Sequence, residues 1–242
     1  MKILNLGCGT KTSIKPEVTN IDWSIYLRLK RNWLLRHIVP LFVKGIRLER
    51  FKQLGNNIMV HNLAKGIPFE SNSIDVVYHS HLLEHLDQDV AKQFLLEIKR
   101  VLKPNGILRI VVPDMEKVCR DYVSHIEVSE KNDVEAQKHN QYISAIIEQS
   151  VRRESYGVSQ QKPFRRYLEN LLLGDARRRG ETHQWMYDRI SLSTLLINFG
   201  FKEPQTQKYN SSTITNWNNY GLDFDQNGNE YKPNSLYIEA KA

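Results

Sequence analysis

The first ten residues constrain the fold of this chain most, because an apolar stretch there passes directly into a tight glycine turn. Ile3–Leu6 is mainly apolar and predicts a buried strand, and two glycines on either side of a cysteine follow it at positions 7–9. Glycine lets the backbone turn sharply and lets a ligand approach the peptide plane closely. The pattern indicates a site for a nucleotide-like cofactor. Because Lys11 stands where a dinucleotide fingerprint needs glycine, an ordinary strand-to-turn corner is the alternative.

Further strand-like stretches follow in an order that favours the cofactor interpretation. They are Val18–Asp22, Asn57–His61, Ser73–Leu86 and Leu102–Asp114. Asp22 ends the second of the five strands, where a carboxylate can accept both hydroxyls of a ribose. Because strands alternate with helical patterns, the chain is predicted to form a layered α/β sheet.

These stretches together resemble the class I S-adenosylmethionine-dependent methyltransferases, in particular the small-molecule, type 11-like branch. The resemblance covers residues 1–114 and depends on the glycine turn, on the block Asp75–Leu86 (DVVYHSHLLEHL) and on the turn Leu102–Gly106 (LKPNG). It implies a doubly wound, mostly parallel seven-stranded sheet of order 3-2-1-4-5-7-6. It also implies S-adenosylmethionine as cofactor and S-adenosylhomocysteine as product.

The resemblance assigns cofactor contacts to ten positions. They are Asn5, Gly7, Cys8, Gly9, Asp22, Asn62, Leu63, His79, Ser80 and His81. Two positions depart from the family pattern, since Asn5 stands where an acid is usual and Lys11 replaces a third glycine. Both departures predict weaker cofactor binding without removing the adenosine contacts.

Three residues are candidates for a general base, which a hydroxyl acceptor needs in order to lose its proton. They are His81, Asp114 and His183, chosen because histidine titrates near neutral pH and a carboxylate can orient it. Each has a structural alternative: His81 packs on the cofactor, Asp114 caps a helix, and His183 is a satisfied buried histidine.

His183 is expected on the acceptor side, because the preceding insertion has to return to the sheet at this point. Trp185 and Tyr187 are then expected to stack on a sugar ring, and the basic run 177–179 to attract an anionic group. The block His183–Arg189 is similar to a feature of relatives associated with cell-surface sugar biosynthesis.

Two metal-like patterns occur. His81–His85 has the H-x-x-E-H spacing of a zinc protease, but the sequence shows no downstream helix that supplies a third ligand, so no metal site is predicted. Asp223–Gly228 copies the start of a calcium loop, but Asn234 stands at the twelfth position, so a polar turn is expected.

Two helical insertions are expected in a single domain spanning residues 1–242. The first, about 24–56, has a net charge of +7, the same as the whole chain. Its apolar spacing, interrupted at Pro40, predicts two basic amphipathic helices. A pair packed on the sheet is favoured over a surface that contacts an anionic membrane. The second, about 115–182, is expected to be a helical lid on the acceptor side.

Sequence patterns also predict the last elements. Ser191 is expected to cap a helix, and Phe201–Tyr209 and Leu236–Lys241 are expected to be the last two strands. In Ile107–Val112, Arg109 is the one residue expected to escape burial.

The composition bears on location and partners. With two cysteines and no apolar leader at Met1, a cytoplasmic protein without a disulfide framework is expected, with peripheral contact to the inner membrane surface as an alternative. The oligomeric state is not predicted.

The function predicted from these features is O-methylation of a small polar acceptor, a saccharide or a related surface-glycan precursor. An acceptor that carries an anionic group would suit the positive charge of the chain. A nucleic-acid methyltransferase is an alternative that the positive charge favours and that the absence of an N-P-P-Y-like block disfavours. A non-catalytic protein that binds S-adenosylmethionine is a second alternative, motivated by Asn5 and Lys11.

Overall fold

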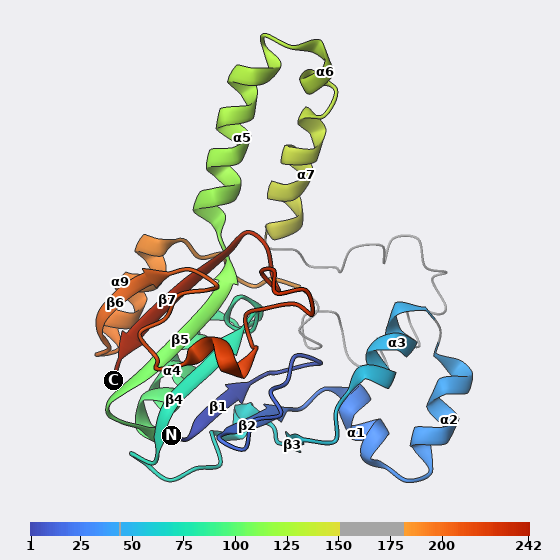
Figure 1. The fold of residues 1–242 in the computed structure, drawn as a ribbon, viewed down its shortest axis with the longest axis vertical. Coiled ribbons are helices and arrows are strands. Elements are labelled where there is room, and N and C mark those ends of the chain that lie inside the picture. The colour runs from blue at the N-terminus through green and yellow to red at the C-terminus, as the bar shows by residue number, and fades with distance from the viewer. Residues whose placement is uncertain (44, 151–181) are drawn as a thin grey trace.

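A computed structural model describes residues 1–43, 45–150 and 182–242, and seven strands in these parts of the chain form one sheet (Figure 1). The strands are β1 (Ile3–Leu6), β2 (Val18–Asp22), β3 (Ile58–Val60), β4 (Ile74–Ser80), β5 (Leu102–Pro113), β6 (Lys202–Gln207) and β7 (Ser235–Lys241). Their order, β3-β2-β1-β4-β5-β7-β6, confirms the predicted sheet.

The first five strands are parallel, whereas β7 runs antiparallel between β5 and β6. β1 lies in the middle, with Ile3 paired with Val18 of β2 on one side and with Val76 of β4 on the other. Because β1, β2 and β4 run in the same direction, the residues that follow them meet at one edge of the sheet. We call this the carboxyl edge.

Two layers cover the sheet. The helices of the described residues are α1 (Ile25–Arg31), α2 (Leu35–Phe42), α3 (Ile46–Gln53), α4 (Gln88–Val101), α5 (Met115–Ser129), α6 (Asp133–Ala136), α7 (His139–Gln149) and α9 (Arg189–Asn198), with short 3-10 turns η1 (Leu63–Lys65), η2 (Leu83–His85) and η4 (Trp217–Tyr220). The buried stripes of α4 and α9 pack on one face, and Trp217 of η4 packs on the other face against Tyr78. The second face is thus covered by the C-terminal segment.

The first insertion contains three helices, so the prediction of two is wrong. The chain breaks at Asn32, whose side-chain oxygen accepts hydrogen bonds from the Leu34 and Leu35 amides, and at Gly45, which has φ +61°. Pro40 lies inside α2 without ending it. Capping and a left-handed glycine therefore decided the boundaries.

A basic residue of α1 connects this helix to the end of α3. Lys30 Nζ donates to the carbonyl oxygens of Lys52 and Leu54, at 2.7 Å each. Leu27 of α1 and Leu54 are buried with Cys8 and Ile58, which attaches α1 and the end of α3 to the sheet. Part of the positive charge of this insertion is therefore structural.

In the second insertion, α5, α6 and α7 form a helical hairpin that projects beyond the carboxyl edge (Figure 1). The ring of His125, buried in α5, stacks on Tyr142 of α7 with centroids 4.0 Å apart. Residues 115–149 are mostly helical, as predicted, while the expectations for 151–181, including the arginine run 177–179, lie outside the described residues.

Arg109 corrects a further expectation, because its side chain is fully buried instead of exposed. Its guanidinium pairs with Asp223 at 2.9 Å and with Glu239 at 2.5 Å. The Trp217 indole also donates to Asp223, at 2.6 Å. The guanidinium of Arg109 can be buried because two carboxylates of the C-terminal segment, those of Asp223 and Glu239, neutralise its charge.

The start of α9 differs by three residues from the prediction. Asp188 is the N-cap, accepting hydrogen bonds from the Ile190 and Ser191 amides, and Ser191 Oγ completes the capping box by accepting a hydrogen bond from Asp188 N–H. The last two strands are β6 and β7, with β6 shorter than predicted. None of the helices in the described ranges has the length and apolar character needed to cross a bilayer.

Candidate functional site

The glycine turn lies at the carboxyl end of β1. Gly7 and Gly9 have φ of +62° and +53°, a region that suits glycine. A Cβ at Gly7 would lie 2.9 Å from Leu82 Cδ2, so the turn packs closely under the segment that follows β4. At Gly9 a Cβ would meet no atom within 4 Å. The backbone at Gly9 is thus open to a ligand.

Asp22 lies at the carboxyl end of β2 and is buried. Its two carboxylate oxygens accept hydrogen bonds from Gly9 N–H at 2.8 Å and from Ser24 N–H at 2.6 Å. Each oxygen keeps a further lone pair for a hydroxyl donor. The arrangement fits a residue that holds ribose beside the glycine turn.

Asn62 and Leu63 follow β3 at the same edge. The Asn62 side-chain oxygen accepts from Ala64 N–H at 3.0 Å and so shapes η1. The Leu63 N–H has no acceptor within the described part of the chain. An unpaired donor here suits a ring nitrogen of adenine, as the resemblance implies.

Asn5, the first departure from the family pattern, has a structural role. Its buried amide donates to Lys11 O and to Asn20 Oδ1, both at 2.9 Å. A carboxylate has no hydrogen to donate to either oxygen, which explains why an amide suits this position.

Lys11, the second departure, reaches away from the glycine turn. Its ammonium donates to Phe224 O and lies 4.5 Å from the ring centroid of Tyr231. It therefore links the turn to the C-terminal segment. Whether either departure weakens cofactor binding stays a prediction.

Cys8 shapes the turn through its packing. Its side chain lies among Leu27, Leu54 and Ile58, and its N–H donates to Ile21 O at 3.1 Å. Burial raises the pKa of the Cys8 thiol, so no reactive thiolate is present at neutral pH.

His79 is fully buried, with its ring 5.5 Å from that of Phe94 in α4. Burial lowers its pKa to about 3, and neither ring nitrogen has a hydrogen-bond partner among the described residues. This placement argues against a side-chain contact with the cofactor. Ser80 ends β4, and His81 is the first residue beyond it.

Four side chains converge just beyond β4, and we call them the edge cluster: His81, Glu84, His85 and His183. His81 Nδ1 and His85 Nε2 lie 3.4 and 3.8 Å from Glu84 Oε1. The rings of His85 and His183 meet edge to face, with centroids 5.0 Å apart. Sequence reasoning missed Glu84 and His85 as site residues, although the H-x-x-E-H spacing signalled them.

Backbone contacts bring His183 to this place. The N–H groups of Gln184 and Trp185 both donate to Glu84 O, at 2.6 and 3.2 Å. Because η2 follows β4 and its neighbour Leu82 packs on Gly7, His183 lies on the same edge as the glycine turn. The sequence argument considered only a downstream helix as the source of a third ligand, whereas a non-helical segment brings His183 beside the H-x-x-E-H block.

The edge cluster has unusual electrostatics. The Glu84 side chain is 1% exposed, and burial raises its pKa to about 8. Burial likewise lowers the pKa of His81 to about 3 and that of His85 to about 4. His81 and His85 are thus neutral at pH 7 and present a ring nitrogen as acceptor.

Asp114 caps α5, as its structural alternative stated, by accepting a hydrogen bond from Lys117 N–H at 3.1 Å. Burial raises its pKa. Asp114 also forms a β-bridge with Tyr187, whose ring is buried and so offers no stacking surface, whereas Trp185 is 43% exposed. A catalytic role for Asp114 stays a prediction.

The calcium-like loop is a polar turn. Asp223 is occupied by Arg109, and Asp225 Oδ1 accepts hydrogen bonds from Asn227 and Asn229 N–H, at 2.8 Å each. These contacts account for the carboxylates at its start.

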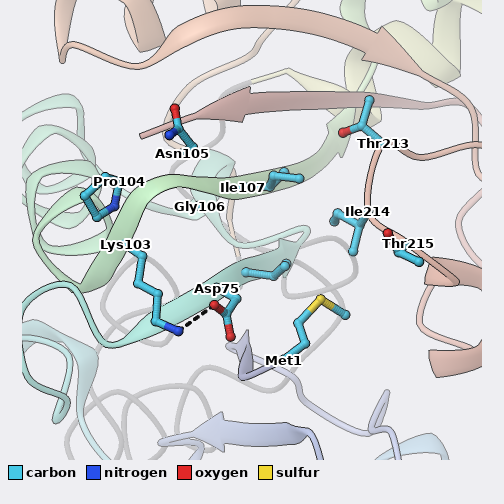
Figure 2. Close-up of a pocket in the computed structure, with 11 residues that line it drawn as sticks. Met1, Asp75, Lys103, Pro104, Asn105, Gly106, Ile107, Thr213, Ile214 and Thr215 are labelled. Atoms are coloured by element: carbon cyan, nitrogen blue, oxygen red, sulfur yellow. Dashed lines mark hydrogen bonds and ion pairs between the residues drawn. The ribbon is translucent and has the colours of Figure 1, made fainter.

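A hollow of about 240 Å³ lies at the opposite, amino edge of β4 (Figure 2). Met1, the ion pair between Asp75 and Lys103 (2.7 Å) and Ile214 line part of it. Because the hollow lies at the far end of the strands from Gly7 and Asp22, we do not assign it to the functional site.

Residues 38–110 match the family described as methyltransferase domain. Curated proteins give no match. Among solved structures, the chain is similar to an S-adenosylmethionine-dependent methyltransferase from Archaeoglobus fulgidus (14% identity, 100% of this chain and 86% of that one, TM-score 0.43). It is also similar to one from Mesorhizobium loti (13%, 100% and 90%, TM-score 0.44) and to DhpI in complex with SAH (13%, 99% and 75%, TM-score 0.48).

The strand order, the open backbone at Gly9 and the placement of Asp22 agree with the family match. Over residues 38–110 the chain is thus similar to the methyltransferase domain family, and its strand order is the one that this resemblance implies.

Proposed function

We propose that this enzyme methylates a hydroxyl oxygen of a saccharide or a related surface-glycan precursor. The observation that carries the proposal is the edge cluster. Glu84 has no hydrogen-bond partner for its carboxylate within the described residues and lies beside three imidazoles at the edge where ligands of such sheets bind. A hydroxyl acceptor has to lose a proton, and this cluster provides unpaired acceptors for it.

The residues of the glycine turn hold the methyl donor in this proposal. Asp22 accepts the ribose hydroxyls, the open backbone at Gly9 receives the methionine part, and Leu63 N–H faces adenine. S-adenosylmethionine supplies a methyl group already activated on a sulfonium. The main work of the protein is therefore to align the acceptor oxygen and to exclude water.

Trp185 supports a sugar as acceptor. Its N–H donates to Glu84 O, which places the residue beside the edge cluster, and its side chain is 43% exposed. An exposed indole presents an apolar face that suits the C–H face of a sugar ring. Lys232, close enough to lower the pKa of both His81 and Glu84, offers positive charge to an anionic acceptor.

Methyl transfer from labelled S-adenosylmethionine to saccharides, nucleic acids and water tests the proposal. We expect incorporation into saccharide hydroxyls, and we expect His183→Gln to lower turnover by about 10²–10⁴-fold while cofactor binding is kept, because a positioned proton acceptor contributes that much. His37→Gln, an exposed histidine in α2, is the matched control and should leave turnover unchanged. Label in nucleic acid alone, or equal turnover of both variants, would contradict the proposal.

We also propose that α2 contacts an anionic membrane surface. Trp33 and Leu41 are 74% and 72% exposed, and Leu34 and Ile38 are exposed between them. These apolar side chains lie in the insertion whose net charge is +7. Exposed aromatic and aliphatic groups beside basic residues are typical of helices that lie in a membrane interface.

Pelleting with vesicles measures this contact. We expect pelleting with acidic vesicles that falls with salt, since exposed charges are screened beyond about 8 Å at physiological ionic strength. Trp33→Ser with Leu41→Ser should weaken binding by at least about tenfold, because each buried apolar side chain contributes about 1.5–3 kcal/mol. Val123→Ser, on exposed α5, is the control. Equal pelleting with neutral vesicles would rule out the electrostatic part.

A further inference from the structure

The edge cluster joins two parts of the chain that are about a hundred residues apart in sequence. Glu84 and His85 come from η2, and His183 comes from the segment before α9. One ligand atom from each of Glu84, His85 and His183 lies within 4.8 Å of the other two. The double hydrogen bond from residues 184 and 185 to Glu84 O holds the two segments together.

Hydrogen bonds determine which ring nitrogens of His85 and His183 carry a proton. His85 Nδ1 donates to Thr182 O at 3.2 Å, and His183 Nδ1 donates to Gln149 O at 3.0 Å. A carbonyl oxygen only accepts, so each Nδ1 bears the hydrogen and each Nε2 of the neutral ring bears a lone pair. Distal hydrogen bonds to backbone carbonyls orient metal-binding histidines in the same way.

His81 shows the same arrangement with the nitrogens exchanged. Its Nε2 lies 2.9 Å from Ser235 Oγ, and that hydroxyl donates its own hydrogen to Lys232 O at 2.7 Å. The His81 Nε2 is therefore the donor, and the Nδ1 lone pair is directed at Glu84. His81 also has φ +50°, a strained backbone conformation for a residue other than glycine.

The edge cluster thus brings hydrogen-bond acceptors together with no hydrogen-bond donor between them in the described residues. Both oxygens of Glu84 lack a hydrogen-bond partner among the described residues, and the side chain is almost completely buried. Lys232 faces the cluster from the C-terminal segment but forms no ion pair with Glu84 in the described ranges. Converging lone pairs at a buried carboxylate are costly unless a cation or a proton lies between them.

We propose that Glu84, His85 and His183 bind a divalent first-row transition-metal ion of the Zn²⁺ type. Two imidazole nitrogens and a carboxylate oxygen are ligands that zinc accepts, and three protein ligands leave one position open for a further ligand. Zn–N distances of about 2.0–2.1 Å place neighbouring ligand atoms about 3.4 Å apart in a tetrahedral site. The three ligand atoms lie within 4.8 Å of one another, so the widest separation this allows has to shorten by about 1.4 Å when a metal binds.

The open position has a use at this edge. His85, whose side chain is 23% exposed, is accessible from outside, so the fourth ligand can be an acceptor oxygen. A bound divalent ion lowers the pKa of an oxygen ligand and makes it a better nucleophile. This use rests on the proposed function, whereas the binding of the metal does not.

Titration of the chelator-treated full chain with Zn²⁺ tests the binding, with Co²⁺ as a spectroscopic probe. We expect one Zn²⁺ per chain, a Co²⁺ visible spectrum of low coordination number, and a raised melting temperature. Glu84→Gln and His183→Ala should each weaken Zn²⁺ binding by more than about 100-fold, since changes to second-shell residues alone cost about 10–100-fold. His37→Ala should bind as the unchanged chain does, and Mg²⁺, which prefers oxygen ligands, should not compete.

If the folded chain takes up no Zn²⁺, the proposal is overturned. A proton on the Glu84 carboxylate then lies between the converging lone pairs. Uptake that is undiminished in both folded variants overturns it as well, because the ion then lies elsewhere. Circular dichroism shows whether each variant folds, and Glu84→Gln preserves the shape of the side chain. Zn²⁺ binding without saccharide methylation would contradict the proposed function alone, while methylation that persists in excess chelator would contradict only a catalytic use of the metal.

Discussion

Arg109→Met is expected to lower the free energy of unfolding by about 3–5 kcal/mol, the range for removing one partner of a buried ion pair. Arg109 is fully buried and neutralises both Asp223 and Glu239. Without the guanidinium, the negative charges of the two buried carboxylates repel each other. Only neutral hydrogen-bond donors then remain beside them. Denaturant unfolding followed by circular dichroism measures the loss.

Lys92→Met is the matched control, because Lys92 pairs with Asp89 at an exposed position. Exposed pairs contribute about 0–1 kcal/mol, so this variant should unfold close to the unchanged chain. Asp223→Asn combined with Arg109→Met should recover part of the stability, because one uncompensated charge is removed. Equal losses in Arg109→Met and Lys92→Met would show that the buried cluster does not stabilise the fold.

Asp22→Ala is expected to weaken binding of S-adenosylhomocysteine by about 10²–10⁴-fold. The estimate takes two hydrogen bonds to a charged acceptor, at about 1.5–3 kcal/mol each. The variant also frees the Gly9 N–H, which now donates to Asp22 at 2.8 Å. Calorimetric titration of the folded variant measures the change.

Asp22→Asn separates the two effects, because an amide still accepts one hydrogen bond from Gly9 but has no charge. We expect it to bind more weakly than the unchanged chain and more tightly than Asp22→Ala. Asp89→Ala, at a fully exposed carboxylate, is the control. Normal binding by Asp22→Ala would move the ribose site elsewhere, and no heat with the unchanged chain would count against the cofactor assignment.

Several parts of the candidate site were predictable because they depend on local sequence. A glycine turn after a strand and an acid after the next strand are adjacent features of a parallel sheet, so Gly7, Gly9 and Asp22 were found from spacing. Asn5 and Lys11 were recognised as departures, but their partners Asn20 and Phe224 were not. A pattern shows that a residue is unusual, and only the neighbours show what it does.

The sequence by itself determined the layered α/β class, because short apolar strands alternate with helical stripes such as that of α4, whereas the strand order followed from the family resemblance. It also predicted the edge at which a cofactor would bind, since parallel strands direct their following turns to one edge.

Only the tertiary structure decided which distant side chains meet. Arg109 reads as a solvent-facing residue until Asp223, 114 positions away, enters the same interior. His183 reads as an isolated histidine until the backbone of its neighbours binds Glu84 O and places it beside His85. Such contacts depend on chain segments brought together by folding of the whole sheet, and no local period in the sequence encodes them.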